Sequence, residues 1–243
     1  MDNLIYISAV FLLAGTVKGV TGMGLPTVAV ALLSLTMAPM QAAALLVVPS
    51  LLTNLWQVLT GAPLYPVWSR FWPMMAGICA GTLAGGLFAL RAEWAAGALG
   101  IALVTYAGAG LLALRWKVKQ ENAYWQSPLV GIVTGAIAVT TGVFVLPAVP
   151  YLQALELERD ELVQAMGLAF TVSTLAIAVS LAAHDAWQPA VAGASFLMQV
   201  PALAGMLLGQ KLRQRMPPAL FRRCLLFMLM LLGMQLALRA AWS

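Results

Sequence analysis

The sequence predicts an all-α, polytopic integral membrane protein built from two inverted repeats. Each repeat is expected to hold a broken or re-entrant helical hairpin followed by three transmembrane helices. Three observations lead to this fold class. The 243 residues are 62% hydrophobic and only 9% charged, long stretches carry no ionisable side chain, and two similar helix breaks stand about 120 residues apart.

The scarcity and clustering of charge indicate bilayer solvent. Soluble domains carry about 25% charged residues, whereas Lys18 is the one charged residue between Asp2 and Arg70. Residues 122–155 and 186–210 contain none. Each of these stretches can hold a span of about 20 residues, and in lipid the backbone must be satisfied within helices. The net charge of +5 comes from basic residues at the ends of apolar segments, which argues against a nucleic-acid partner.

Eight apolar segments follow one another along the chain. They cover residues 4–35, 40–59, 71–90, 95–114, 127–155, 161–183, 187–210 and 219–238. The first and fifth are too long for one comfortable crossing, and each contains a break: KGVTGMGLP at 18–26 and TTGVFVLP at 140–147.

The second half of the chain echoes the first. Gln41-Ala42 recurs as Gln164-Ala165 at an offset of 123 residues, and Gly81 and Gly85 recur as Gly205 and Gly209 at an offset of 124. We therefore expect a single membrane domain of two repeats, residues 1–120 and 121–243.

The distribution of basic residues favours inverted repeats. If both long segments crossed once, basic residues would divide five against seven between the two sides. If both turn back as re-entrant hairpins, ten share one side: Arg70, Arg115, Lys117, Lys119, Arg159, Lys211, Arg213, Arg215, Arg222 and Arg223. Arg91 and Arg239 take the other side, and Lys18 stays in the membrane. Ten against two agrees with the positive-inside rule. Both termini are then expected outside, and the loops near Arg70, Lys117, Arg159 and Arg215 in the cytoplasm.

The two breaks are the candidate substrate-binding elements. Inverted repeats with discontinuous helices are typical of secondary transporters, whose sites lie at the membrane midplane. A broken helix frees backbone N–H groups, and the positive end of its second half attracts anions. We expect the two breaks to face each other around a small anion, through Thr21, Gly22, Met23, Gly24 and Pro26 on one side and Thr140, Thr141, Gly142 and Val143 on the other. The alternative is that glycine and proline merely allow tight helix packing.

Four further polar residues at membrane depth are candidates. Lys18 lies one helical turn before Gly22 and would add positive potential, unless its long side chain snorkels to an interface. Asn54, Gln57 and Gln199 either line the pathway or form hydrogen bonds between helices.

The chemistry that is missing narrows the function classes. No Asp or Glu lies within a span core, and we find no metal cluster and no nucleophile with a base. No cofactor or metal is expected, and an enzyme is disfavoured. His184 beside Asp185 is expected to be an interfacial residue.

The first break and its surroundings, residues 14–26, resemble the opening motif of the sulfite exporter TauE/SafE family of bacterial membrane permeases, and residues 135–147 echo it. The likeness extends over essentially the whole chain. It implies a plasma-membrane permease for sulfite, sulfoacetate or another organosulfur anion, with Gly22, Gly24, Pro26, Gly142 and Pro147 at the site. The chain departs from the family's glycine-rich pattern at Met23 and at Val143-Phe144. A non-transporting membrane scaffold or accessory subunit is the alternative function, and a membrane-embedded enzyme is a weaker one.

Overall fold

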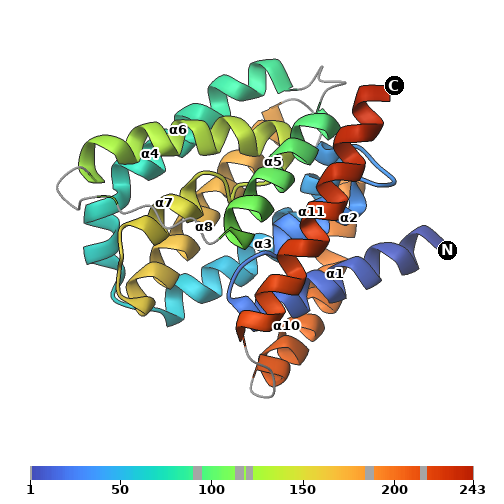
Figure 1. Cartoon of the computed structure of the whole chain (residues 1–243), viewed down its shortest axis with the longest axis horizontal. Coiled ribbons are helices and arrows are strands. Elements are labelled where there is room, and N and C mark those ends of the chain that lie inside the picture. The colour runs from blue at the N-terminus through green and yellow to red at the C-terminus, as the bar shows by residue number, and fades with distance from the viewer. Residues whose placement is uncertain are drawn as a thin grey trace. The chain divides into compact units, whose positions relative to one another are not determined.

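The computed structural model describes residues 2–89, 95–112, 118, 123–183, 189–213 and 218–242. These residues form α-helices joined by short connections, with no strand among them, which confirms the predicted all-α fold (Figure 1). Of the residues considered above, Arg91, Arg115, Lys117, Lys119, His184, Asp185 and Arg215 lie outside the described part.

The helices form two compact units. Unit 1 comprises Met1–Pro49, Ala92–Leu114 and Pro189–Ser243, and unit 2 comprises Ser50–Arg91 and Arg115–Gln188. Each unit therefore takes helices from both halves of the sequence. The predicted repeats, residues 1–120 and 121–243, divide the sequence and not these compact units. The division into repeats stays a prediction.

Unit 1 begins with a hairpin made of α1 (Asp2–Thr21) and α2 (Leu25–Leu33). The helix stops at the predicted break, and the chain then runs back along α1. The hydroxyl of Tyr6, near the start of α1, donates to the carbonyl of Leu32, near the end of α2, at 2.6 Å. Eight of the nine residues of α2 are buried, so this half-helix lies in the interior of the fold.

The remaining helices of unit 1 are the first part of α3 (Pro39–Thr60), α5 (Ala95–Leu111), α9 (Pro189–Leu197), α10 (Gln199–Arg213) and α11 (Pro218–Trp242). Helix α1 packs against α10 through a four-residue glycine spacing on each helix. A Cβ added to Gly15 or Gly19 would collide with the carbonyl of Ala202 or Met206, and one added to Gly205 or Gly209 would collide with that of Leu12 or Thr16. Contacts advance together along both helices, so α1 and α10 run parallel.

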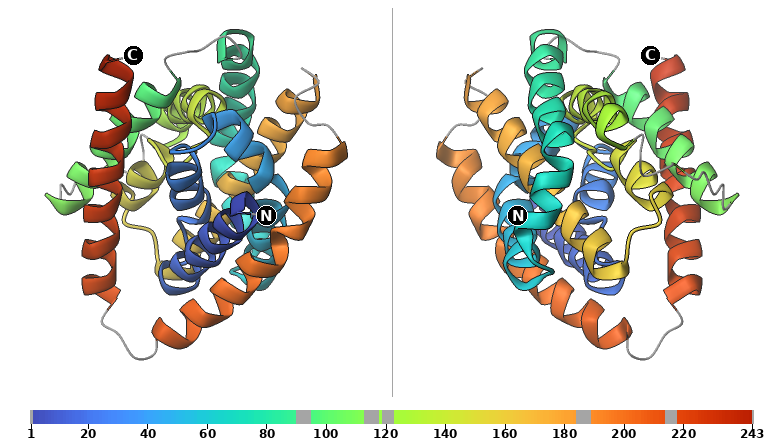
Figure 2. Two further views of the ribbon diagram at one scale, coloured as in Figure 1. Left: turned by 90° about the vertical axis from the view of Figure 1, so that its right-hand side faces the viewer. Right: turned by 90° about the vertical axis from the view of Figure 1, so that its left-hand side faces the viewer.

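Helices α5 and α11 lie side by side in unit 1 but run antiparallel (Figures 1 and 2). The early residue Gly97 of α5 faces Ala240 at the end of α11, whereas Gly110 faces Leu226 near its start. Between these ends Gly100 and Gly233 bring the two backbones close together.

Unit 2 contains the rest of α3 together with α4 (Leu64–Ala89), α6 (Ala123–Thr141), α7 (Ala148–Ala154) and α8 (Arg159–Ala183). Its hairpin, α6–α7, turns back at the second predicted break. The hydroxyl of Tyr151 donates to the carbonyl of Ala123 at 3.0 Å and lies 3.0 Å from the hydroxyl of Ser127, both at the start of α6. Helix α6 packs parallel to α4, because Gly77 and Gly81 meet the backbone at Pro128 and Ile132.

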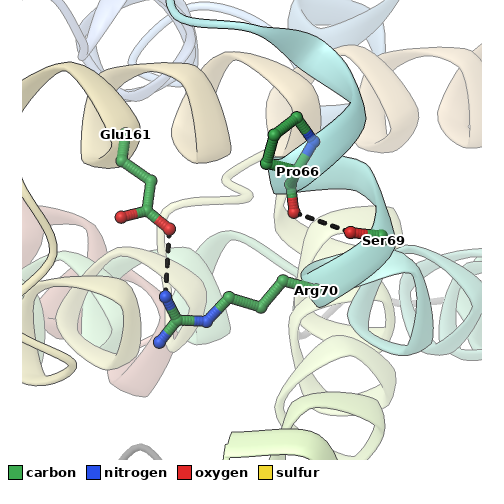
Figure 3. A network of polar contacts seen from close by, with 4 residues as sticks. All are labelled: Pro66, Ser69, Arg70 and Glu161. Atoms are coloured by element: carbon green, nitrogen blue, oxygen red, sulfur yellow. Dashed lines mark hydrogen bonds and ion pairs between the residues drawn. The ribbon is translucent and has the colours of Figure 1, made fainter.

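Helices α4 and α8 also run parallel within unit 2. Near their starts an Arg70 guanidinium nitrogen lies 3.0 Å from Glu161 Oε1, and in the same turn of α4 the Ser69 hydroxyl donates to the Pro66 carbonyl at 3.0 Å (Figure 3). Near their ends a Cβ on Gly86 would lie 2.8 Å from the hydroxyl of Ser180.

Four helices in the described part of the chain are long and apolar enough to cross a membrane, by length and composition. They are Leu4–Thr21, Pro39–Thr60, Asp160–Ala183 and Val191–Leu212, and shorter apolar helices cover Ala96–Leu111 and Leu225–Leu238. Large apolar side chains such as Ile5, Leu59 and Val200 are exposed. Helices with apolar surfaces of this kind are those of a membrane protein.

Candidate functional site

The first break is closed by a hydroxyl and by a glycine. The N–H of Gly22 donates to the carbonyl of Lys18 at 2.7 Å and ends α1. The hydroxyl of Thr21 lies 2.9 Å from the carbonyl of Val17 and 2.7 Å from that of Met23, and it accepts the N–H of Met23 at 3.3 Å. Gly22 has φ 79° and Gly24 has φ 96°, a region that favours glycine.

The second break repeats the main part of this arrangement. The N–H of Gly142 donates to the carbonyl of Ala138 at 2.8 Å, and φ of Gly142 is 72°. The hydroxyl of Thr141 donates to the carbonyl of Ile137 at 2.7 Å and accepts the N–H of Val143 at 3.2 Å. Thr21-Gly22 and Thr141-Gly142 are therefore structural counterparts, 120 residues apart.

The hydroxyls of the three predicted threonines face backbone carbonyls in this structure. We expected Thr21, Thr140 and Thr141 to supply hydroxyl donors to a ligand. Instead the Thr140 hydroxyl lies 3.1 Å and 2.9 Å from the carbonyls of Ala136 and Ile137, and the other two hydroxyls also face backbone carbonyls. The hydroxyl protons are thus directed at carbonyls of the breaks themselves, and the role of these threonines as donors to a ligand stays a prediction.

Beyond the shared turn the two breaks differ. After the first, α2 begins at once, with Gly24 as its N-cap and Pro26 in its first turn, where the missing N–H of proline is tolerated. The first hydrogen bond of α2 runs from the N–H of Val28 to the carbonyl of Gly24 at 2.9 Å. The N–H groups of Leu25 and Thr27 precede it and open at the positive end of the helix.

After the second break the chain is packed by apolar side chains. Val143, Phe144 and Val145 are buried, and the ring of Phe144 lies 5.5 Å from that of Phe170 in α8. Helix α7 begins only after Pro147 and has seven residues. The helix that follows the second break is thus shorter than α2, and the residues before it are more apolar.

Lys18 is buried inside the protein. Its exposed fraction is 5%, although a lysine that snorkels to an interface keeps its ammonium in water. The burial therefore argues against snorkelling and places a basic side chain in unit 1, one helical turn before the first break.

The other polar candidates are divided between the units. Gln57 lies in unit 2 and donates its side-chain N–H to the carbonyl of Val163 in α8 at 2.8 Å, which is the interhelical hydrogen bond given above as its alternative role. Asn54, in the same unit, is fully buried. Gln199 lies in unit 1 with 8% exposure, and its side-chain oxygen has no partner in the described part of the chain.

The two breaks lie in different compact units, so the expectation that they face each other stays a prediction.

Two features were not predicted from the sequence. Thr27 is a buried threonine directly after Pro26, and its position in the first turn of the half-helix was the signal for it. An apolar groove of about 450 Å³ between α4 and α8, lined by residues such as Trp72, Cys79 and Leu175, left no sequence signal that separates it from ordinary lipid-facing surface.

In the described residues no group of three or more His, Cys, Asp or Glu side chains is placed to hold a metal ion.

A comparison with protein-family models gives a match to the family described as "Sulfite exporter TauE/SafE", over residues 7–236. No match was found among curated proteins or among solved structures.

Proposed function

The chain belongs to the sulfite exporter TauE/SafE family of membrane transporters, and from this premise we propose that it carries a small sulfur-containing oxyanion or organosulfonate, such as sulfite or sulfoacetate. We place this transport across the plasma membrane of a bacterium. Transport by a secondary transporter requires no bond to be made or broken, and no cofactor takes part.

The first break is the observation that supports an anionic substrate most directly. It opens the N–H groups of Leu25 and Thr27 at a half-helix start, with the basic side chain of Lys18 buried one turn away. N–H groups and a positive helix end bind negative charge without any covalent chemistry. Buried within a transporter, such a half-helix start is where anionic substrate groups bind.

Helix directions support the inverted, hairpin-containing arrangement. With eight simple crossings, α4 and α8 would be the third and sixth and would run antiparallel, while α5 and α11 would be the fourth and eighth and would run parallel. The structure has α4 parallel to α8, and α5 antiparallel to α11. These are the directions expected when both broken segments turn back, since α4 and α8 then become the second and fourth crossings.

The ion pair between Arg70 and Glu161 supports part of the proposed orientation. It joins the starts of α4 and α8, and the loops near Arg70 and Arg159 are both proposed to be cytoplasmic. We retain the proposal that both termini lie outside, with the loops near Lys117 and Arg215 also in the cytoplasm.

Flux into proteoliposomes tests the function. Purified protein is reconstituted, and uptake of ³⁵S-labelled sulfite and of labelled sulfoacetate is compared with uptake into protein-free vesicles. We expect protein-dependent flux of at least one of them, and a loss of roughly tenfold or more in Lys18→Ala, because a charge-assisted contact contributes about 1.5–3 kcal/mol. Lys211→Ala, which removes an exposed basic residue, is the matched control and should retain the wild-type rate. Absence of flux for both anions, in vesicles shown to contain folded protein, would contradict the proposal.

A further inference from the structure

Thr27, the third residue of α2, has a buried hydroxyl without a hydrogen-bond partner. The side chain is 2% exposed, and Oγ1 contacts no donor or acceptor in the described part of the chain. Threonines within helices of this protein, such as Thr134 and Thr174, donate to the carbonyl four residues earlier. For Thr27 that carbonyl belongs to Met23, which instead lies 2.7 Å from the hydroxyl of Thr21.

The position of Thr27 directs this hydroxyl toward the start of α2. Side chains on an α-helix lean toward its N-terminus, and Thr27 lies in the first turn. The hydroxyl therefore leans toward the end at which the N–H groups of Leu25 and Thr27 open. A buried hydroxyl without a partner is unfavourable, and this one leans toward the open N–H groups at the start of α2, so an acceptor bound there would satisfy it.

The second break lacks counterparts of Lys18 and of the Thr27 hydroxyl. Ala138 stands 120 residues after Lys18, and Ala148, the first residue of α7, stands 121 residues after Thr27. The shared turn of threonine and glycine is kept in both breaks, whereas both polar groups that favour an anion occur in the first alone.

We propose that the first break, in unit 1, binds the substrate anion, with the hydroxyl of Thr27 as its side-chain donor. This inference rests on the proposed function and deepens it. A sulfite or sulfonate group presents three oxygens, and the hydroxyl of Thr27 together with the N–H groups of Leu25 and Thr27 offers three donors. Lys18 supplies positive potential, and the second break contributes no charged or hydroxyl group to the anion.

Equilibrium binding to the full-length protein in detergent tests this assignment, with ³⁵S-sulfite and labelled sulfoacetate as the two probes. In Thr27→Val, which keeps the shape and loses the hydroxyl, we expect the dissociation constant to rise roughly tenfold to a hundredfold, as for a lost hydrogen bond to a charged group. Thr27→Ser restores the hydroxyl and should bind within about threefold of the wild type. Ser34→Ala is the matched control, because Ser34 caps the other end of α2 with another buried hydroxyl that has no partner, and it should bind as the wild type does.

Each outcome decides a different point. Wild-type binding that is unchanged in Thr27→Val overturns the role of Thr27 and leaves the proposed function intact. A wild type that binds and carries neither probe overturns both proposals. If Thr27→Val is not recovered as a monodisperse protein, Thr27→Cys takes its place, since a thiol is a weaker donor than a hydroxyl; binding at the wild-type level in Thr27→Cys then overturns the assignment.

Discussion

Gln57 in α3 and Gln164 in α8 each donate a hydrogen bond to the main chain of the other's helix. The side chain of Gln57 donates to the carbonyl of Val163 at 2.8 Å, and the side chain of Gln164 donates to the carbonyl of Val58 at 2.9 Å. Each glutamine therefore binds the main chain directly beside the other, and the pair fastens the end of α3 to the start of α8.

Removal of Gln164 should destabilise the protein more than removal of Gln57. Gln164 is fully buried, so Gln164→Ala leaves a cavity as well as losing a hydrogen bond, and we expect a loss of about 2–4 kcal/mol. Gln57→Ala is expected to lose about 1 kcal/mol. Denaturant unfolding in detergent measures both values. Gln153→Ala, at an exposed position, serves as the control, and equal losses at positions 57 and 164 would contradict the prediction.

The conformation of Gly22 can be tested without steric interference. Its φ is 79°, and a Cβ added there would meet no atom within 4 Å. Gly22→Ala should therefore lose about 1–2 kcal/mol from backbone strain alone. Gly22→Asn should lose less, because asparagine tolerates this region. If Gly22→Asn unfolds more easily than Gly22→Ala, the positive φ of Gly22 is not the cause of the lost stability.

The glycine contact between α1 and α10 should be intolerant of a single methyl group. A Cβ on Gly19 would collide with the carbonyl of Met206, so Gly19→Ala must separate the two helices and is expected to lose about 1–3 kcal/mol. Gly193→Ala is the matched control, because a Cβ there meets nothing within 4 Å and alanine favours a helix more than glycine does. The yield of folded protein and its thermal unfolding in detergent compare the two; equal behaviour would argue against close backbone packing at Gly19.

Labelling tests the proposed topology. In a variant with Cys79 and Cys224 replaced by alanine, a single cysteine is introduced at the exposed Ala38 or at the exposed Ser69. A maleimide that cannot cross the membrane should label Ala38→Cys from outside intact cells and Ser69→Cys only in inverted vesicles. The reason is that α3, with 22 residues, spans about 33 Å at 1.5 Å per residue. Labelling of both positions from one side, or of each from the opposite side, would refute the orientation.

The sequence predicted helical structure and both breaks because these are local properties. Lack of charge indicates helices in a bilayer, and glycine with proline at 22–26 indicates where one helix ends and another begins. The partner of each helix is not a local property: α1 packs on α10, nearly two hundred residues away, through backbone contacts that any small residue could offer. For this reason the two compact units, each drawn from both halves of the chain, did not follow from the repeat.

The geometry of the two breaks was predicted in part for the same reason. The position of the first break and its glycines followed from the residues, whereas the hydrogen bonds of the threonines did not. A hydroxyl in a helix can bind its own backbone or a ligand, and only the geometry of Thr21 and Thr141 distinguishes the two. Thr27 was overlooked because one threonine among apolar residues looks like an ordinary core residue until its missing partner is known.

Both breaks are held in shape by their own atoms. The hydroxyls of Thr21 and Thr141 bind within the turn that they close, and the adjacent glycines fix its direction. As part of the proposed binding site, a turn of this kind is preorganised: the anion would not have to order it, so association would lose little conformational entropy. Discrimination between anions then depends on how well each fits a rigid frame. On this proposal, a change in the side chains around the turn would alter which anion is preferred while the turn itself stayed in place.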